Sequence, residues 1–172
     1  ELAAELEACR PSPAGPSPED RPDSDFLLRA YETWGPECVG HLVGVFVFVV
    51  WDRQARRLFA ARSPIVAPML VYHATARSFA FATAPCGLHA LPTVPRALDE
   101  QRLAEMLVQR GDGSTSRTLY RNVSRLPTGH WCQASAQRMK IECFWRPDPR
   151  REIHYGRDEE YIAAFSDLFE RV

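Results

Sequence analysis

Lysine is almost missing from this sequence: Lys140 is the only lysine among 21 basic residues in a chain of 172. The excess of arginine, with abundant alanine and proline, fits a genome rich in G and C; recognition of phosphate or carboxylate by planar guanidinium groups is the alternative. The net charge is −1, so no bulk field attracts nucleic acid or an anionic membrane, and we expect neither as a partner. The sequence also lacks an apolar run of about 20 residues, long enough to span a bilayer, and a secretory signal at its start.

Cysteines are few, and their spacing does not pair them. The five cysteines are scattered with no C-x-x-C motif, which indicates a reduced, cytoplasmic protein with incidental thiols. Cys38 and His41 share a helical face, and Cys132 and Cys143 can face each other across a hairpin. Neither pair has a third and fourth ligand nearby, so we expect no zinc site.

The segment Val45–Trp51 is apolar at every position and rich in strand-forming residues. A strand with one wet face alternates apolar and polar residues, so this strand is expected to be covered on both faces. Further strands are predicted at 57–62, 69–73, 78–82, 130–134 and 139–145, and helices at 1–8, 25–34, 99–109 and 159–172. A doubly covered antiparallel sheet with helices at both ends of the sequence predicts a layered α+β sandwich.

Short motifs along the chain resemble, in the same order, those of the asparagine synthetase family. The longest is Leu42–Asp52, which resembles the family segment L-x-G-x-F-A-F-A-x-W-D. The other blocks that resemble the family are Glu1–Glu7, Asp23–Gly35, Arg57–Arg62, Phe79–Ala82, Val94–Asp99, Thr118–Val123, Arg125–His130 and Phe144–Pro147. Each block is modest, but the ordered set covers nearly the whole chain.

This resemblance implies a class II glutamine amidotransferase-like domain with the Ntn-hydrolase four-layer αββα sandwich, incomplete at its N-terminus. In the family, an N-terminal Cys uses its own α-amino group as base, attacks the glutamine side-chain amide and releases ammonia to a synthetase domain. Residues 1–150 would form the amidotransferase-like domain without its catalytic segment. Residues 151–172 would form a linker and the first helix leading into the synthetase domain. ATP and Mg are implied for that domain, and no cofactor for this chain.

Asp23 is the only position at which the resemblance places a substrate contact, with the amine of glutamine. A second interpretation is that Asp23 or Ser24 caps the following helix, and the two roles are compatible. Residue 1 is Glu rather than Cys, so we assign no catalytic residue and no metal ligand. The intact protein is expected to be an enzyme, a glutamine-hydrolysing asparagine synthase or a related ATP-dependent C–N ligase, and this chain alone to be inactive.

One loop departs from the family pattern and keeps a second function open. Arg62–Met69 stands where the family has R-D-x-x-G-x-x-P-L, but the Asp and Gly are gone, and with the Gly goes its freedom to take positive φ. The domain could therefore be the scaffold of a lasso-peptide cyclase or β-lactam synthetase-like enzyme, which forms a lactam or macrolactam without supplying ammonia. The partner is then a peptide or small amine-bearing substrate instead of glutamine; a homodimer is left open.

Overall fold

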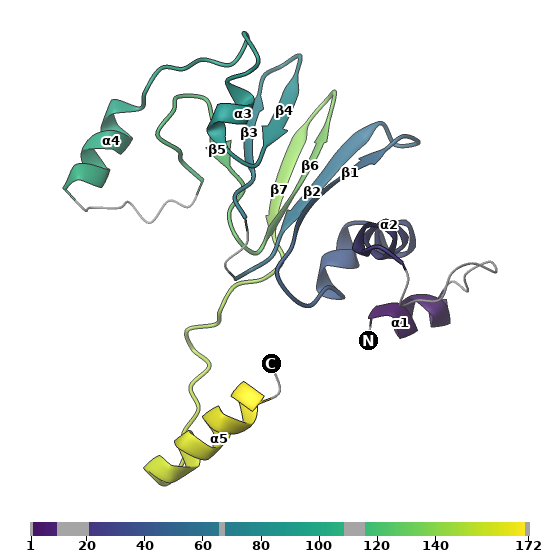
Figure 1. Ribbon diagram of the computed structural model, residues 1–172, viewed down its shortest axis with the longest axis vertical. Coiled ribbons are helices and arrows are strands. Elements are labelled where there is room, and N and C mark those ends of the chain that lie inside the picture. Colours follow the sequence, from purple (N-terminus) through teal and green to yellow (C-terminus); the bar gives the residue numbers. More distant parts are fainter. Residues whose placement is uncertain (1, 10–20, 66–67, 109–115, 171–172) are drawn as a thin grey trace.

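The computed structural model describes residues 2–9, 21–65, 68–108 and 116–170, and this part of the chain forms two antiparallel sheets (Figure 1). Sheet A has the strand order β1-β2-β6-β7, with β1 at Val47–Asp52, β2 at Arg57–Arg62, β6 at His130–Ser135 and β7 at Met139–Cys143. Sheet B has the order β4-β3-β5, with β3 at Val71–Ala74, β4 at Phe79–Ala82 and β5 at Ser124–Arg125. The helices are α1 (Leu2–Cys9), α2 (Asp23–Trp34), the 3-10 helix η2 (Gly35–Gly40), α3 (Pro85–Leu88), α4 (Glu100–Leu107) and α5 (Asp158–Glu170).

Sheet A is covered on both faces, as the unbroken apolar sequence of β1 predicts. On one face, Phe48 and Val50 of β1 pack in a core with residues of β2, β6, α1, α2 and η2, among them Phe59, Trp131, Leu6, Tyr31 and Cys38. On the other face, Val47 and Val49 pack in a second core that includes Ala60, Cys132, Leu70, Leu126 and Phe79. The second core joins the two sheets, because Phe79 lies on β4 whereas Ala60 and Cys132 lie on β2 and β6.

A third core covers the outer face of sheet B. It contains Val71 of β3, Leu88 of α3, Val94 and Val123. The described part of the chain is therefore layered in the order helices, sheet A, sheet B, α3, and Figure 1 shows α1 and α2 on the opposite side of the sheets from α3. The predicted α+β class is confirmed.

Phe59 lies at the centre of the core between sheet A and the helices, and it is fully buried. Its ring stacks on Tyr31 of α2 with centroids 5.0 Å apart and lies 5.8 Å from the ring of Trp131. Tyr31 is anchored in turn at its hydroxyl, which donates to the Asp52 carboxylate at 3.4 Å. The aromatic contacts thus fix α2 against β1 and β2, and the candidate site lies where α2 meets the segment that leads into β1.

The start of α2 differs from the helix-cap prediction. The helix begins at Asp23 rather than Asp25, the capping position belongs to Pro22, and no side chain donates or accepts a capping hydrogen bond. Proline is tolerated at this boundary because it needs no N–H there, since the first N–H groups of a helix have no acceptor within the helix. The cap role proposed for Asp23 or Ser24 is therefore wrong, and Asp23 instead lies within the first turn.

The helices α4 and α5 stand away from the layered body (Figure 1), and neither has a buried residue. Helical spacing in the sequence predicts that Met106 and Leu107 face a core, and this is wrong, since their exposed fractions are 54% and 77%. The predicted ends of these helices at Gln109 and Val172 lie outside the described residues. Asp99 does cap α4, because its side chain accepts a hydrogen bond from the Arg102 backbone N–H.

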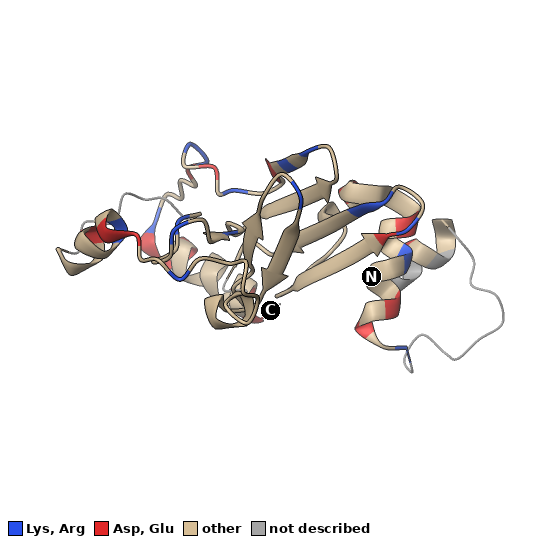
Figure 2. Ribbon diagram, turned by 90° about the horizontal axis from the view of Figure 1, so that it is seen from above, with Lys and Arg blue, Asp and Glu red and all other residues tan. Residues whose placement is uncertain are grey.

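Charged residues of both signs are interspersed over the helices, turns and strand ends, whereas most of the strand ribbon carries other residues (Figure 2). The helices in the described segments are too short or too polar for any of them to cross a membrane. The five cysteines are free thiols, and only Cys38 and Cys132 among them are buried.

Candidate functional site

A groove lies where α1 and α2 meet the segment that leads into β1. It encloses about 360 Å³, and we call it the Asp23 groove; its walls are formed by Leu2, Asp23, Phe26, Leu27, Leu42, Val43, Val45 and Phe46. Asp23 is the only charged residue among these, and the other walls are apolar. A carboxylate in an apolar surround can fix the orientation of a ligand that carries one cationic group.

The carboxylate of Asp23 is not engaged in the fold. It makes no capping hydrogen bond, and within the described segments no hydrogen bond or ion pair joins it to another residue. Asp25, two residues further along α2, differs in this respect, because its carboxylate forms an ion pair with the Arg21 guanidinium at 3.7 Å. An exposed carboxylate on the wall of a groove is available to bind a ligand ammonium group, which the resemblance predicts for Asp23.

Phe46, which lines the groove, is held by Ser63, a fully buried residue that follows β2. Its backbone N–H donates to the Phe46 carbonyl at 2.9 Å, and its hydroxyl accepts from the Phe46 N–H at 3.1 Å. The same hydroxyl donates to the Ile65 carbonyl at 3.4 Å. Ser63 stands where the family pattern has Asp, and here its hydroxyl joins the ends of β1 and β2 instead.

Two valines at the rim leave the groove open. Val43 is 93% exposed and Val45 is 64% exposed, beside Phe46, which packs partly against the core. Contiguous exposed apolar side chains next to a polar group are typical of a surface that binds a ligand or another segment of chain.

The buried cysteines are not suited to nucleophilic chemistry. Burial raises the pKa of the Cys38 thiol to about 12 and that of Cys132 to about 11, whereas a reactive cysteine needs a lowered pKa. The prediction that Cys132 and Cys143 face each other is wrong, because Cys132 pairs with Ile141 and Cys143 with His130 in the hairpin. Cys38 and His41 also lie in different environments. Cys38 is fully buried, whereas the His41 ring stacks on Trp34 with centroids 3.9 Å apart.

No cluster of three or more His, Cys, Asp or Glu residues that could hold a metal ion occurs in the described ranges. Two further histidines contact backbone carbonyl groups: buried His73 lies 2.7 Å from the Asn122 carbonyl oxygen, and His130 lies 2.8 Å from that of Thr128. His130 is paired with Cys143 across the hairpin, but in the described segments no hydrogen bond joins either histidine ring to a thiol or hydroxyl, as activation of a nucleophile requires.

Sequence reasoning missed a charged cluster between α4 and the segment before β5. Arg117 contacts both carboxylate oxygens of Asp99, at 2.9 and 3.1 Å, and reaches Glu105 at 3.1 Å; Arg102 reaches the same Glu105 at 3.2 Å. Asp99, Arg102 and Glu105 are spaced three residues apart, which places them on one helix face, and this spacing could have indicated the cluster from the sequence. Arg117 carries no such signal, because it comes from outside the helix.

The cluster makes α4 sensitive to acid. The hydrogen bond from the Arg102 backbone N–H, followed by the Arg117 guanidinium, holds the pKa of Asp99 below its usual value, and Arg117 has a raised pKa, chiefly because of Asp99. A lowered carboxyl pKa in the folded state stabilises the fold above the unfolded-state pKa of about 3.9 and stops doing so as the pH falls through the folded value.

We therefore expect Asp99→Asn to reduce the hydrogen-exchange protection of the Leu103 amide, which donates to the Asp99 carbonyl, at pH 6, and we expect this reduction to shrink as the pH falls through the folded-state pKa of Asp99. Asparagine caps helices as well as aspartate, so the variant isolates the charge. A difference in protection that stayed constant while acid protonated the Asp99 carboxylate would contradict the account.

Comparison with known proteins places these observations in a family. Residues 12–145 match the profile of the glutamine amidotransferase domain. The chain is 26% identical over 148 residues to asparagine synthetase [glutamine-hydrolyzing] 3 of Bacillus subtilis, covering 86% of this chain and 24% of that protein. It is 28% identical over 120 residues to a putative asparagine synthetase [glutamine-hydrolyzing] of Mycobacterium tuberculosis, covering 68% of this chain and 18% of that protein.

The relatives also include a protein named as an amidase. The amidase chyE of Penicillium rubens is 26% identical over 143 residues, covering 82% of this chain and 20% of that protein. The chain thus spans about a quarter or less of the length of these curated relatives. The family profile covers most of the chain, including Asp23 and every other residue that lines the groove except Leu2, and the chain belongs to the glutamine amidotransferase domain family.

Proposed function

We propose that the Asp23 groove binds the α-ammonium group of glutamine, in an intact enzyme that hydrolyses glutamine to supply ammonia. The observation that carries the proposal is the position of Asp23, an unengaged carboxylate on the wall of an apolar groove in a glutamine amidotransferase domain. Glutamine has one ammonium group, one carboxylate and a short apolar stem. The ammonium group suits Asp23, and the stem suits the valine and phenylalanine walls.

In the proposed reaction, the nucleophile is an N-terminal Cys thiolate contributed by residues upstream of Glu1. It attacks the side-chain amide carbon, the C–N bond breaks, and the leaving nitrogen takes a proton to depart as ammonia. Water then attacks the resulting thioester and releases glutamate and the thiol. Asp23 does not touch the reacting carbon; it positions the substrate by its amine.

The layer order supports a finer proposal for the fold. Helices, two antiparallel sheets and a further helix are the parts of an Ntn-hydrolase αββα sandwich, and we propose that fold for residues 1–150 together with the upstream segment. In that fold the nucleophile lies on the first strand. Val43 and Val45, exposed at the rim of the Asp23 groove, offer an apolar surface for the packing of such a strand.

Residues 151–172 are proposed to lead into an ATP-dependent synthetase domain. The helix α5 exposes Tyr161, Ile162, Phe165, Leu168 and Phe169, and a helix with such a face is normally packed against another element. The asparagine synthetases among the relatives are at least four times longer than the region matched here. ATP and Mg would act in that further domain, where ammonia would attack an adenylated carboxylate.

The second candidate function keeps the scaffold without the glutaminase. The observation that favours it is Ser63, which replaces the family Asp and spends its hydroxyl on local hydrogen bonds. In a lasso-peptide cyclase or β-lactam synthetase-like enzyme, an amine within the peptide or small substrate would attack the adenylated carboxylate, and no glutamine would be needed.

Covalent labelling separates the two candidates. The intact protein would be incubated with 6-diazo-5-oxo-L-norleucine, a glutamine analogue whose diazo carbon alkylates a thiolate with loss of dinitrogen, and digested for mass spectrometry. We expect one adduct on the N-terminal Cys, prevented by excess glutamine. Labelling scattered over other cysteines, or none, would reject the glutaminase and leave the lactam-forming candidate.

A further inference from the structure

One wall of the Asp23 groove is a short stretch of chain without regular structure, which we call the wall segment (residues 42–46). It lies between η2, which ends at Gly40, and β1, which begins at Val47. The wall segment contributes half of the residues that line the groove, namely Leu42, Val43, Val45 and Phe46. The path of this segment therefore sets the width of the groove.

The wall segment is weakly held along most of its length. His41, just before it, is fixed by its backbone N–H, which donates to the Cys38 carbonyl at 3.0 Å. Within the part of the chain that the structure describes, no hydrogen bond joins residues 42–45 to another residue. The segment also bends at Gly44, whose φ of +114° is a conformation that other residues rarely adopt. Such a stretch keeps its path only if both of its ends are fixed.

Ser63 fixes the far end of the wall segment, at Phe46. The Ser63 hydroxyl accepts from the Phe46 N–H at 3.1 Å, and the Ser63 N–H donates to the Phe46 carbonyl at 2.9 Å. Both backbone polar groups of Phe46 therefore end on one fully buried residue. The Phe46 ring packs partly against the core, 5.8 Å from the ring of Phe48. The hydroxyl thus ties the irregular wall segment to the end of β2.

We propose that Ser63 is a positioning residue for glutamine, because its hydroxyl holds the wall segment in the path that places it beside the substrate stem. This inference rests on the proposed function, which assigns the groove to glutamine. Ser63 does not line the groove, so it acts through Phe46. Loss of the hydroxyl leaves the Phe46 N–H without its acceptor, whereas the second hydrogen bond between the two residues and the pairing of β1 with β2 remain. The wall segment then shifts while the fold persists.

Steady-state glutamine hydrolysis by Ser63→Ala in the intact protein tests the inference. We expect KM to rise by about 3–10-fold with kcat retained, because a buried N–H without a partner favours rearrangement and the wall lies beside the stem rather than the reacting amide. A purely structural effect would lower the active fraction instead, which reduces kcat at unchanged KM. Ser63→Thr keeps the hydroxyl and should restore KM to within about twofold of the unmodified protein.

Gly44→Ala perturbs the wall segment without touching the core. A Cβ at Gly44 would meet no atom within 4 Å, so the substitution strains only the bend and should also raise KM by about 3–10-fold at constant kcat. Gly35→Ala is its matched control, because Gly35 has φ of +59° and an equally open surround but lies outside the groove. In Gly35→Ala, KM should stay within about twofold.

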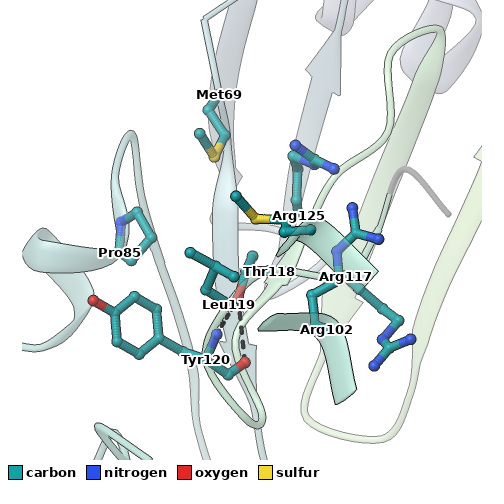
Figure 3. A pocket seen from close by; sticks show the side chains of 9 residues that line it. Met69, Pro85, Arg102, Arg117, Thr118, Leu119, Tyr120 and Arg125 are labelled. Carbon is teal, nitrogen blue, oxygen red and sulfur yellow. Dashed lines mark hydrogen bonds between the residues drawn. The ribbon is translucent and has the colours of Figure 1, made fainter. Parts of the chain in front are cut away.

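Thr118→Val is the matched control for the loss of a hydroxyl. Thr118 lines a separate pocket between α4 and sheet B, where its hydroxyl accepts from the Tyr120 N–H at 3.1 Å and donates to the Val123 carbonyl at 2.6 Å. Figure 3 shows the contacts of this hydroxyl with the Tyr120 backbone. The pocket shares no lining residue with the Asp23 groove. Thr118→Val should therefore leave KM within about twofold, even where it lowers stability.

The outcomes separate this inference from the glutamine site itself. If Asp23→Asn raises KM whereas Ser63→Ala and Gly44→Ala leave it unchanged, the inference is overturned and the proposed function stands. A loss of kcat alone in Ser63→Ala, or an equal rise of KM in Thr118→Val, would show a structural role for Ser63 and overturn the inference. If the intact protein hydrolyses no glutamine, the proposed function and this inference fail together.

Discussion

Asp23→Asn in the intact protein should lower kcat/KM for glutamine hydrolysis by about 10–100-fold, because a hydrogen bond to a charged group is worth about 1.5–3 kcal/mol. The loss should fall on KM with little change in kcat. The α-ammonium group of glutamine lies several bonds from the amide that reacts, so its contact with Asp23 stabilises substrate and transition state equally. Glutamate release over a range of glutamine concentrations separates the two constants.

Asp25→Asn is the matched control for this variant. Asp25 lies in the same first turn of α2 and faces the same helix dipole, but it contacts Arg21 and is not part of the groove. The exchange removes one carboxylate from that turn in either variant, so any general effect on α2 is shared. If Asp25→Asn raised KM as much as Asp23→Asn, the groove would not be the site of the ammonium group.

Gly129→Ala should lower the free energy of unfolding by about 3 kcal/mol or more, which corresponds to roughly 6–12 °C in Tm for a domain of this size. Gly129 has φ of +67°, and a Cβ at this position would collide with the Trp145 carbonyl oxygen. The backbone cannot retreat easily: the Gly129 N–H donates to the Arg62 carbonyl at 3.1 Å, and its carbonyl accepts from the Phe144 N–H at 2.9 Å. Thermal and denaturant unfolding measure the loss.

Gly35→Ala separates the two causes of that loss. Gly35 has a similar φ of +59° where α2 ends, but a Cβ there would meet no atom within 4 Å. Its replacement should therefore cost only the backbone strain, about 1–2 kcal/mol. A Gly129→Ala variant no less stable than Gly35→Ala would show that the contact with Trp145 yields without penalty.

Much of the fold was predictable because its strands carry local signals. The unbroken apolar run of β1 predicts a strand that is buried on both faces. The polar turn before Arg57 and Ser63 after Arg62 mark the two ends of β2. The pairings β1 with β2, β3 with β4 and β6 with β7 followed because short polar turns join strands of matching length. The pairing of β2 with β6 could not be predicted from the sequence, because it joins segments about seventy residues apart.

The predictions were wrong where tertiary contacts or backbone geometry, rather than local sequence, determine the structure. Met106 and Leu107 have helical spacing, which predicts an apolar face, but α4 lies at the edge of the body and no described element covers them. Asp23 and Ser24 are favoured capping residues, yet Pro22 takes the capping position one residue earlier. The short helix α3 was missed because four residues that begin with proline give too little periodicity to recognise.

The candidate site was predicted only in part. The family resemblance selected Asp23, and the structure places it on the wall of a groove, but the apolar partners Leu2, Phe26 and Val43 come from three separate segments. The pocket between α4 and sheet B that Arg102, Arg117 and Arg125 help to line had no sequence signal beyond the abundance of arginine, because Arg117 and Arg125 approach α4 only through the tertiary fold.

The most direct test of the central claim is the substrate preference of the intact protein between glutamine and glutaramate, which has the same side-chain amide but no α-ammonium group. The account predicts that glutamate release from glutamine exceeds hydrolysis of glutaramate by about 10–100-fold in kcat/KM, and that Asp23→Asn removes most of this preference. Equal hydrolysis of the two amides by the unmodified protein, or a preference that persists in Asp23→Asn, would contradict it.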